Sequence, residues 1–200
     1  LVEYSTNGGG SWTAVAPPAT SPAAQGLQTY AWTTPVADSN ICKVRVTATD
    51  GAGNTATATS GNFTIDQNAP VVTMVYPLGA ETLSSGATAN IQWSATHTLP
   101  GTLNYELRYS TDAWVGYTTI TTINAAAQGS QSYSWTVPAL CSTTVQVRII
   151  ATDCSGRAGQ ATSSNFTIND TSIPVVRVIS PNGGESWRAG ATTQNIRWNA

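Results

Sequence analysis

The chain repeats itself internally, and this constrains its fold more than any other feature. Six short segments recur in the same order, and the spacing between the copies drifts only from 103 to 105 residues. Such a period identifies the structural unit, because each copy must fold in the same way. The matched pairs are 4–7 with 109–112, 30–35 with 133–138, 44–50 with 147–153, 62–65 with 165–168, 77–81 with 181–185 and 90–93 with 195–198.

The repeated segments have the alternation of β-strands. Val145, Val147 and Ile149 alternate with Gln146, Arg148 and Ile150, which predicts a buried face that packs beside Trp135 and Trp93. In the first copy the same pattern predicts Cys42, Val44, Val46 and Ala48 inward, with Lys43, Arg45 and Thr47 outward. Turn residues separate the strands, no helical period is found, and Thr is abundant, as is typical of β-structure. The strands expected in the complete copy are 71–76, 89–95, 104–110, 116–123, 131–137, 143–152 and 161–168.

Seven short strands per repeat predict an all-β chain of tandem seven-stranded immunoglobulin-like, fibronectin type III-like β-sandwiches. We expect residues 1–70 to be the C-terminal part of one repeat (strands C to G). Residues 71–174 then form a complete repeat, and 175–200 form strands A and B of a further repeat. In order, 175–200 followed by 1–70 rebuild one repeat, so we expect 175–200 of one copy to pack into 1–70 of the next. This contact would be strand donation between chains or the path of one longer chain.

Three segments resemble the B, C and F strands of a fibronectin type III-like domain: 89–93 (ANIQW), 105–109 (YELRY) and 145–151 (VQVRIIA). The wider pattern, including PNGGESWRAG, YSWTVP and NFTI, is similar to tandem repeats of bacterial and archaeal extracellular proteins. The resemblance implies a cell-surface or extracellular location. One departure is that Cys42 and Val145 stand where fibronectin domains often carry a corner Tyr.

Composition excludes several classes of partner. Charged residues make up 9% of the chain, the net charge is −2, and Lys43 is the only lysine, so we expect no nucleic-acid binding. Apolar runs such as 145–151 are too short to insert in a membrane. Low charge with many Thr and Ser residues favours self-assembly or glycosylation.

No catalytic arrangement is recognisable, so we expect no enzyme activity and no cofactor. The only histidine, His97, is predicted to be a solvated loop residue. For Asp50, Asp66, Asp153 and Asp170 two interpretations stay open: weak calcium candidates near the repeat junctions, or ordinary turn residues whose carboxylates bond to the backbone.

The aromatic residues also have two interpretations. Trp32, Trp93, Trp135 and Trp198 recur in phase with the strands and are predicted to be core residues, and Trp187 to be a packing position. Trp114 and Tyr117 either form a sugar-binding platform or cover a sandwich edge.

Cys141 and Cys154 flank a long strand and are predicted to lie too far apart to pair within one domain. A disulfide to another subunit is the alternative for both. Cys42 is predicted to be a small buried apolar residue. Asn62, Asn165 and Asn169 lie in glycosylation sequons.

These features favour a structural role: an extracellular filament, stalk or surface fibre built as a head-to-tail homopolymer of stacked repeats. The alternatives are an adhesin or carbohydrate-binding module that meets glycans, and a spacer region of a secreted hydrolase.

Overall fold

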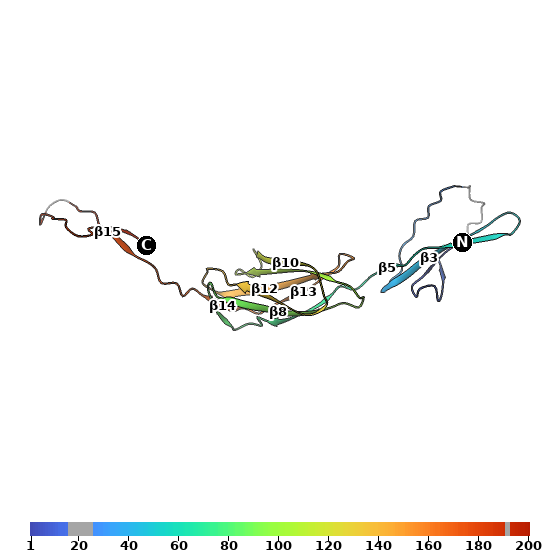
Figure 1. Cartoon of the computed structure of the whole chain (residues 1–200), viewed down its shortest axis with the longest axis horizontal. Coiled ribbons are helices and arrows are strands. Elements are labelled where there is room, and N and C mark those ends of the chain that lie inside the picture. Colours follow the sequence, from blue (N-terminus) through green and yellow to red (C-terminus); the bar gives the residue numbers. More distant parts are fainter. Residues whose placement is uncertain (16–25, 191–192) are drawn as a thin grey trace.

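A computed structural model describes residues 1–15, 26–190 and 193–200. These residues are all-β and form three parts that follow one another along the chain (Figure 1). The first unit contains β1 (Val2–Ser5), β2 (Thr13–Ala14), β3 (Ser39–Thr49), β4 (Thr55–Thr59) and β5 (Phe63–Ile65). The complete unit contains β6 (Val71–Tyr76), β7 (Thr82–Ser84), β8 (Thr88–Thr96), β9 (Leu103–Ser110), β10 (Thr118–Ala126), β11 (Gly129–Thr136), β12 (Ser142–Thr152), β13 (Ala158–Thr162) and β14 (Phe166–Asn169). The terminal hairpin consists of β15 (Arg177–Ser180) and β16 (Arg197–Asn199).

The complete unit is an immunoglobulin-like sandwich of two sheets. One sheet has the order β10-β9-β12-β14-β7, with β13 also paired to β12, and the other has the order β11-β8-β6. Their inner faces share one core, in which the rings of Trp93 and Tyr105 pack edge to face at 5.3 Å between centroids. Val145, Val147 and Ile149 are fully buried there. The predicted register of the long strand is therefore confirmed.

Two details of the strand assignment differ from the sequence prediction. The strand expected over 161–168 is wrong as a single element, because β12 pairs with β13 over Arg148–Thr152 and with β14 over Ser142–Val145. Ser163 marks the step between them: its hydroxyl accepts the Val147 amide at 3.0 Å, and its amide donates to the Val147 carbonyl at 2.8 Å. The short strand β7, parallel to β14, was not predicted.

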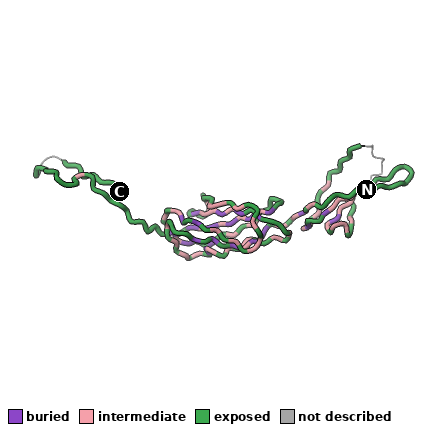
Figure 2. The backbone as a smooth tube through the Cα atoms, in the orientation of Figure 1, coloured by how far each residue is buried: buried purple, intermediate pink, exposed green. Residues whose placement is uncertain are grey.

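The first unit has the same strand order in its one described sheet, β2-β1-β3-β4 with β5 on β3. Cys42 is fully buried, as predicted, but Val46 is 47% exposed and Ala48 is also exposed. The inward prediction is wrong for these two residues, because among the described residues no second sheet lies over this part of β3. Figure 2 shows the buried residues concentrated in the complete unit.

The terminal hairpin presents apolar side chains to solvent. Val178, Ile196, Trp187 and Trp198 are all exposed, between 45% and 64%. The predictions of Trp198 as a core residue and Trp187 as a packing position are therefore not met within the described residues. Equivalent loops nevertheless have equivalent geometry: Glu81 accepts the amides of Leu78 and Gly79, and Glu185 accepts those of Asn182 and Gly183. No helix suited to crossing a membrane occurs in the described part of the chain.

Candidate site at the junction of two units

Five residues, 66–70, link the first unit to the complete unit, and they are held against the complete unit along their length. The Asp66 carbonyl accepts the Arg157 Nε–H at 3.1 Å. Gly159 lies so close to the Pro70 carbonyl that a Cβ added there would be 1.7 Å from its oxygen. The Asn68 side-chain amide donates to Asp38 of the first unit. The linker is therefore packed and hydrogen-bonded.

His97 lies in the loop after β8 and is fixed from two sides. Its backbone amide donates to Gln128 Oε1 at 2.8 Å, and the Gln128 amide donates to the Leu99 carbonyl at 2.8 Å. Gln128 thus holds both ends of the 97–99 turn. The imidazole lies against the linker, with Nε2 at 2.9 Å from the Asn68 carbonyl.

Two carboxylates, one from the linker and one from the complete unit, meet this ring. His97 Nε2 lies 3.4 Å from Asp66 Oδ1 and 3.7 Å from Asp153 Oδ2. One ligand atom from each of the three side chains lies within 4.8 Å of the other two. We call Asp66, His97 and Asp153 the junction triad. Its side chains are only 1%, 4% and 2% exposed.

Burial and neighbouring groups act in opposite directions on the pKa values of the triad. Burial alone would lower the pKa of His97, but the Asn68 carbonyl and the carboxylates of Asp66 and Asp153 together raise it above its ordinary value. Burial alone would raise the pKa of Asp153, but hydrogen bonds from Ser155 and the Arg157 amide, with His97 nearby, lower it. Asp66 Oδ2 and Asp153 Oδ2 are buried, and neither has a hydrogen-bond partner among the described residues.

The sequence identified two members of the triad and missed the third. The prediction of His97 as a solvated loop residue is wrong, because the linker and the turn after β12 cover its ring. Asp66 and Asp153 were assigned to separate turns, whereas the structure brings them together. Two sequence features could have pointed to His97. It is the single histidine of the chain, and it follows the strand expected over 89–95, which ends where the linker meets the complete unit.

The other two calcium candidates serve their own turns. Asp50 Oδ1 accepts the amides of Ala52 and Asn54, each at 2.9 Å, and the hydrogen bonds from Asn54 lower the Asp50 pKa. Asp170 accepts the Ser172 amide and hydroxyl, which lower its pKa in the same way. Both residues are exposed.

The aromatic pair predicted as a ligand platform has arginines stacked on it. The Arg148 guanidinium lies 3.7 Å from the centroid of the Trp114 ring, and that of Arg108 lies 4.2 Å from the Tyr117 centroid. In the first unit Arg45 stacks on Trp12 at 4.2 Å, so the stack recurs in equivalent positions. One face of each ring is therefore occupied by an arginine of the same unit.

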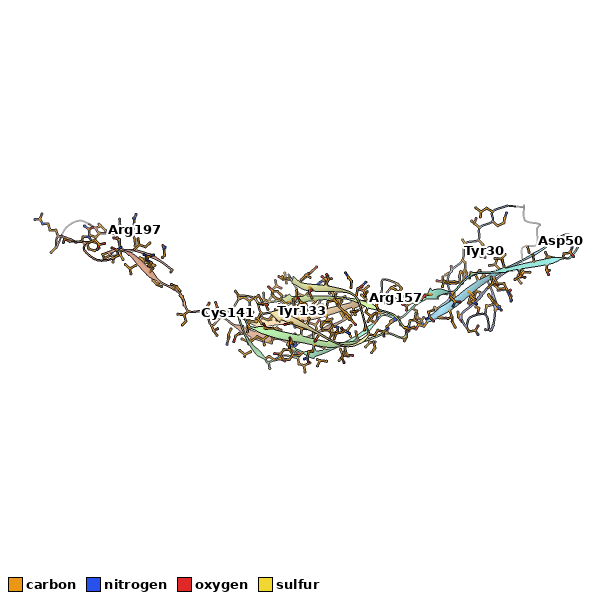
Figure 3. The ribbon with its side chains drawn as sticks, viewed as in Figure 1. Tyr30, Asp50, Tyr133, Cys141, Arg157 and Arg197 are labelled. Carbon is orange, nitrogen blue, oxygen red and sulfur yellow. The ribbon has the colours of Figure 1, made fainter. Side chains whose placement is uncertain are left out.

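The remaining candidates lie apart from the triad. Cys141 and Cys154 are free and exposed, and they flank opposite ends of β12. In Figure 3 Cys141 and Arg157 mark the two ends of the complete unit, and Asp50 lies at the far tip of the first unit. Asn62, Asn165 and Asn169 are exposed.

No protein-family model matches the chain, and no curated protein is significantly similar to it in sequence. Solved structures share its fold only distantly. Superoxide reductase (neelaredoxin) from Ignicoccus hospitalis is 7% identical, with a TM-score of 0.37 over 51% of this chain and 81% of that chain. The fibronectin(III)-like modules of Clostridium thermocellum CbhA are 15% identical, with a TM-score of 0.35 over 56% of this chain and 52% of that chain. A chimeric titin Z1Z2–Z1Z2 tandem is 19% identical, with a TM-score of 0.30 over 66% of this chain and 64% of that chain.

Proposed function

We propose that this chain is a structural repeat protein that builds an extracellular filament, stalk or surface fibre from immunoglobulin-like units stacked end to end. The observation that carries the proposal is the packed linker. A short connection with hydrogen bonds to both units transmits length and direction from one unit to the next. A flexible polar linker would not do so.

A second observation supports head-to-tail assembly. The exposed face of β3 in the first unit corresponds to the face of β12 that the β11-β8-β6 sheet covers in the complete unit. By sequence, β15 and β16 are equivalent to β6 and β8, and they expose Val178, Ile196 and Trp198. The two open surfaces therefore correspond in sequence to the two facing layers of one sandwich, which supports the proposal.

We infer that the terminal hairpin of one copy covers the open face of β1 and β3 in the next copy. The contact joins two different surfaces of the same molecule, so it adds copies in a line rather than closing a dimer. Such strand addition also pairs edges that would otherwise be exposed.

Electron microscopy and sedimentation velocity over a dilution series test this proposal. We expect linear particles that lengthen with protein concentration. Trp198→Asp should abolish them, because a charge would enter the apolar contact. Val115→Asp is the matched control, since Val115 is 91% exposed on the complete unit, and it should leave the particles unchanged. A monomer at every concentration would contradict the filament.

A further inference from the structure

The junction triad contains a charge arrangement that its own hydrogen bonds do not satisfy. Two carboxylates are almost fully buried within reach of each other, and one oxygen of each lacks a donor. Among the described residues, no Lys or Arg nitrogen lies within 4 Å of either carboxylate. The other oxygen of each carboxylate accepts backbone amides, from Asn68 to Asp66 and from Ser155 and Arg157 to Asp153, so only the two Oδ2 atoms are unpaired. A buried unpaired carboxylate oxygen is unfavourable, and a bound cation would satisfy it.

His97 does not fill this role by hydrogen bonding. Its Nε2 lies 2.9 Å from the Asn68 carbonyl, whereas 3.4 and 3.7 Å to the two carboxylate oxygens are too long for good hydrogen bonds. One ligand atom from each of the three side chains nevertheless lies within 4.8 Å of the other two.

We propose that the junction triad binds one divalent transition-metal ion, of which Zn²⁺ is the best fit, through His97 Nε2 and the carboxylates of Asp66 and Asp153. In a tetrahedral zinc site with bonds of about 2.0–2.1 Å, adjacent ligand atoms lie about 3.3–3.4 Å apart. The separations from Nε2, 3.4 and 3.7 Å, are within a few tenths of an ångström of this value, and all three ligand atoms lie within 4.8 Å of one another. Two carboxylates and a neutral imidazole also balance the charge of a divalent ion.

The choice of metal follows from the ligand types. Ca²⁺ takes six to eight oxygen ligands and rarely uses imidazole, whereas imidazole with carboxylates suits zinc and related ions. The other ring nitrogen has a partner in either tautomer. His97 Nδ1 lies 3.3 Å from both the Leu99 amide nitrogen and the Leu99 carbonyl oxygen. When Nε2 carries the proton, Nδ1 accepts the Leu99 amide, and when Nε2 binds metal, Nδ1–H can donate to the carbonyl.

An ion can reach the triad from solvent. A crevice of about 210 Å³ opens beside His97 and Asp153, with Asn40 and Thr64 of the first unit and Gln128 of the complete unit in its walls. A bound ion would join the linker to two loops of the complete unit and restrict bending between the units.

Zinc titration of the metal-stripped chain tests the site, which lies within one chain and is independent of filament assembly. We expect one Zn²⁺ per chain by calorimetry, and visible absorption from Co²⁺ in the same position. Asp66→Asn and His97→Gln each remove a direct ligand and should weaken Zn²⁺ binding by more than the about 10-fold to 100-fold that loss of an outer-shell partner costs. Asp170→Asn, which changes a carboxylate in the following linker, is the matched control and should leave binding unchanged.

Because His97 is the single histidine, zinc binding can also be detected in the unmodified chain. Its imidazole signals in an NMR spectrum report on this site alone, and one equivalent of Zn²⁺ should shift them. Unchanged imidazole signals, or zinc binding that survives His97→Gln in a folded variant, would overturn the proposal. Tighter binding of Ca²⁺ than of Zn²⁺ would overturn the assignment of the metal. Resistance of residues 66–70 to protease should also increase with Zn²⁺ and not in the Asp66→Asn variant.

Discussion

The β1-containing sheet of the first unit and the β9-containing sheet of the complete unit have the same strand order but bury it to different extents. Ile149 on β12 is 0% exposed, whereas its equivalent on β3, Val46, is 47% exposed. Trp135 is buried at 5%, whereas its equivalent Trp32 is only half-buried, against Tyr4 and Phe63. The strands form in both units because backbone pairing within one sheet is sufficient for them. Burial additionally requires the second sheet, which only the complete unit has among the described residues.

The sharpest test of this difference is truncation of the equivalent tryptophans. Trp135→Ala should lower the free energy of unfolding of the complete unit by about 3–5 kcal/mol, because it removes a large buried side chain. In the dilute, unassembled chain Trp32→Ala should cost about 0.5–1.5 kcal/mol, the size of its aromatic contacts. Denaturant unfolding of each variant, followed as two transitions, measures both values.

The same pair of variants also tests the proposed assembly. If Trp32→Ala is as damaging as Trp135→Ala at high protein concentration but not after dilution, another copy covers the first unit. If the costs are equal at all concentrations, the contrast in burial between the two units is wrong.

Gly159 and Ala56 occupy equivalent positions in the two units but differ in their surroundings. Gly159→Ala would place a methyl group against the Pro70 carbonyl, so we expect a cost of about 1–3 kcal/mol and faster cleavage of the linker by protease. The reverse change, Ala56→Gly, lies on an exposed strand and should cost about 0.5–1 kcal/mol without affecting the linker. An unaltered cleavage rate in Gly159→Ala would show that the linker is not packed as described.

The stacked arginines differ in their cross-strand partners. Arg45 pairs with Glu3 at 2.7 Å, whereas Arg148 lies directly opposite Arg108 on the neighbouring strand. Arg45→Gln and Arg148→Gln should each cost about 0.5–1 kcal/mol through loss of the stack on tryptophan. The cost of Arg45→Gln should fall with added salt, since part of it is a partly exposed ion pair with Glu3, and that of Arg148→Gln should not. Unfolding at low and high salt distinguishes them, and equal salt dependence would contradict this assignment.

The smallest expected effect is the acid response of the complete unit. Hydrogen bonds from Arg108 lower the pKa of Glu106 below its ordinary value. A carboxyl group whose pKa is lowered by folding stabilises the fold above its unfolded pKa, and this contribution is lost as the pH falls through the folded pKa. Glu106→Gln should therefore reduce the loss of stability on acidification, by about 0.2–1 kcal/mol for a partly exposed pair. If Glu106→Gln leaves the fall in melting temperature at acid pH unchanged, the Glu106–Arg108 pair does not contribute to the acid response.

Much of the fold could be predicted because the relevant information is local. The alternation of Val145, Val147 and Ile149 assigns their faces within one strand, and the repeat shows where each unit recurs. The split of the last strand could not be predicted in this way. The step at Ser163 depends on how β12 divides its hydrogen bonds between β13 and β14. That division is set by pairing, not by the period of the side chains.

The candidate site shows the same difference between local and tertiary information more clearly. From sequence alone, Asp66 and Asp153 were turn residues and His97 belonged to a loop, and each of these local descriptions fits its own segment. Their meeting was decided by the tertiary structure, because the linker runs across the end of the complete unit where two of its loops project. A period of two along a strand determines which side chains face the core. Only the path of the chain between two packed units determines which charged groups are buried together.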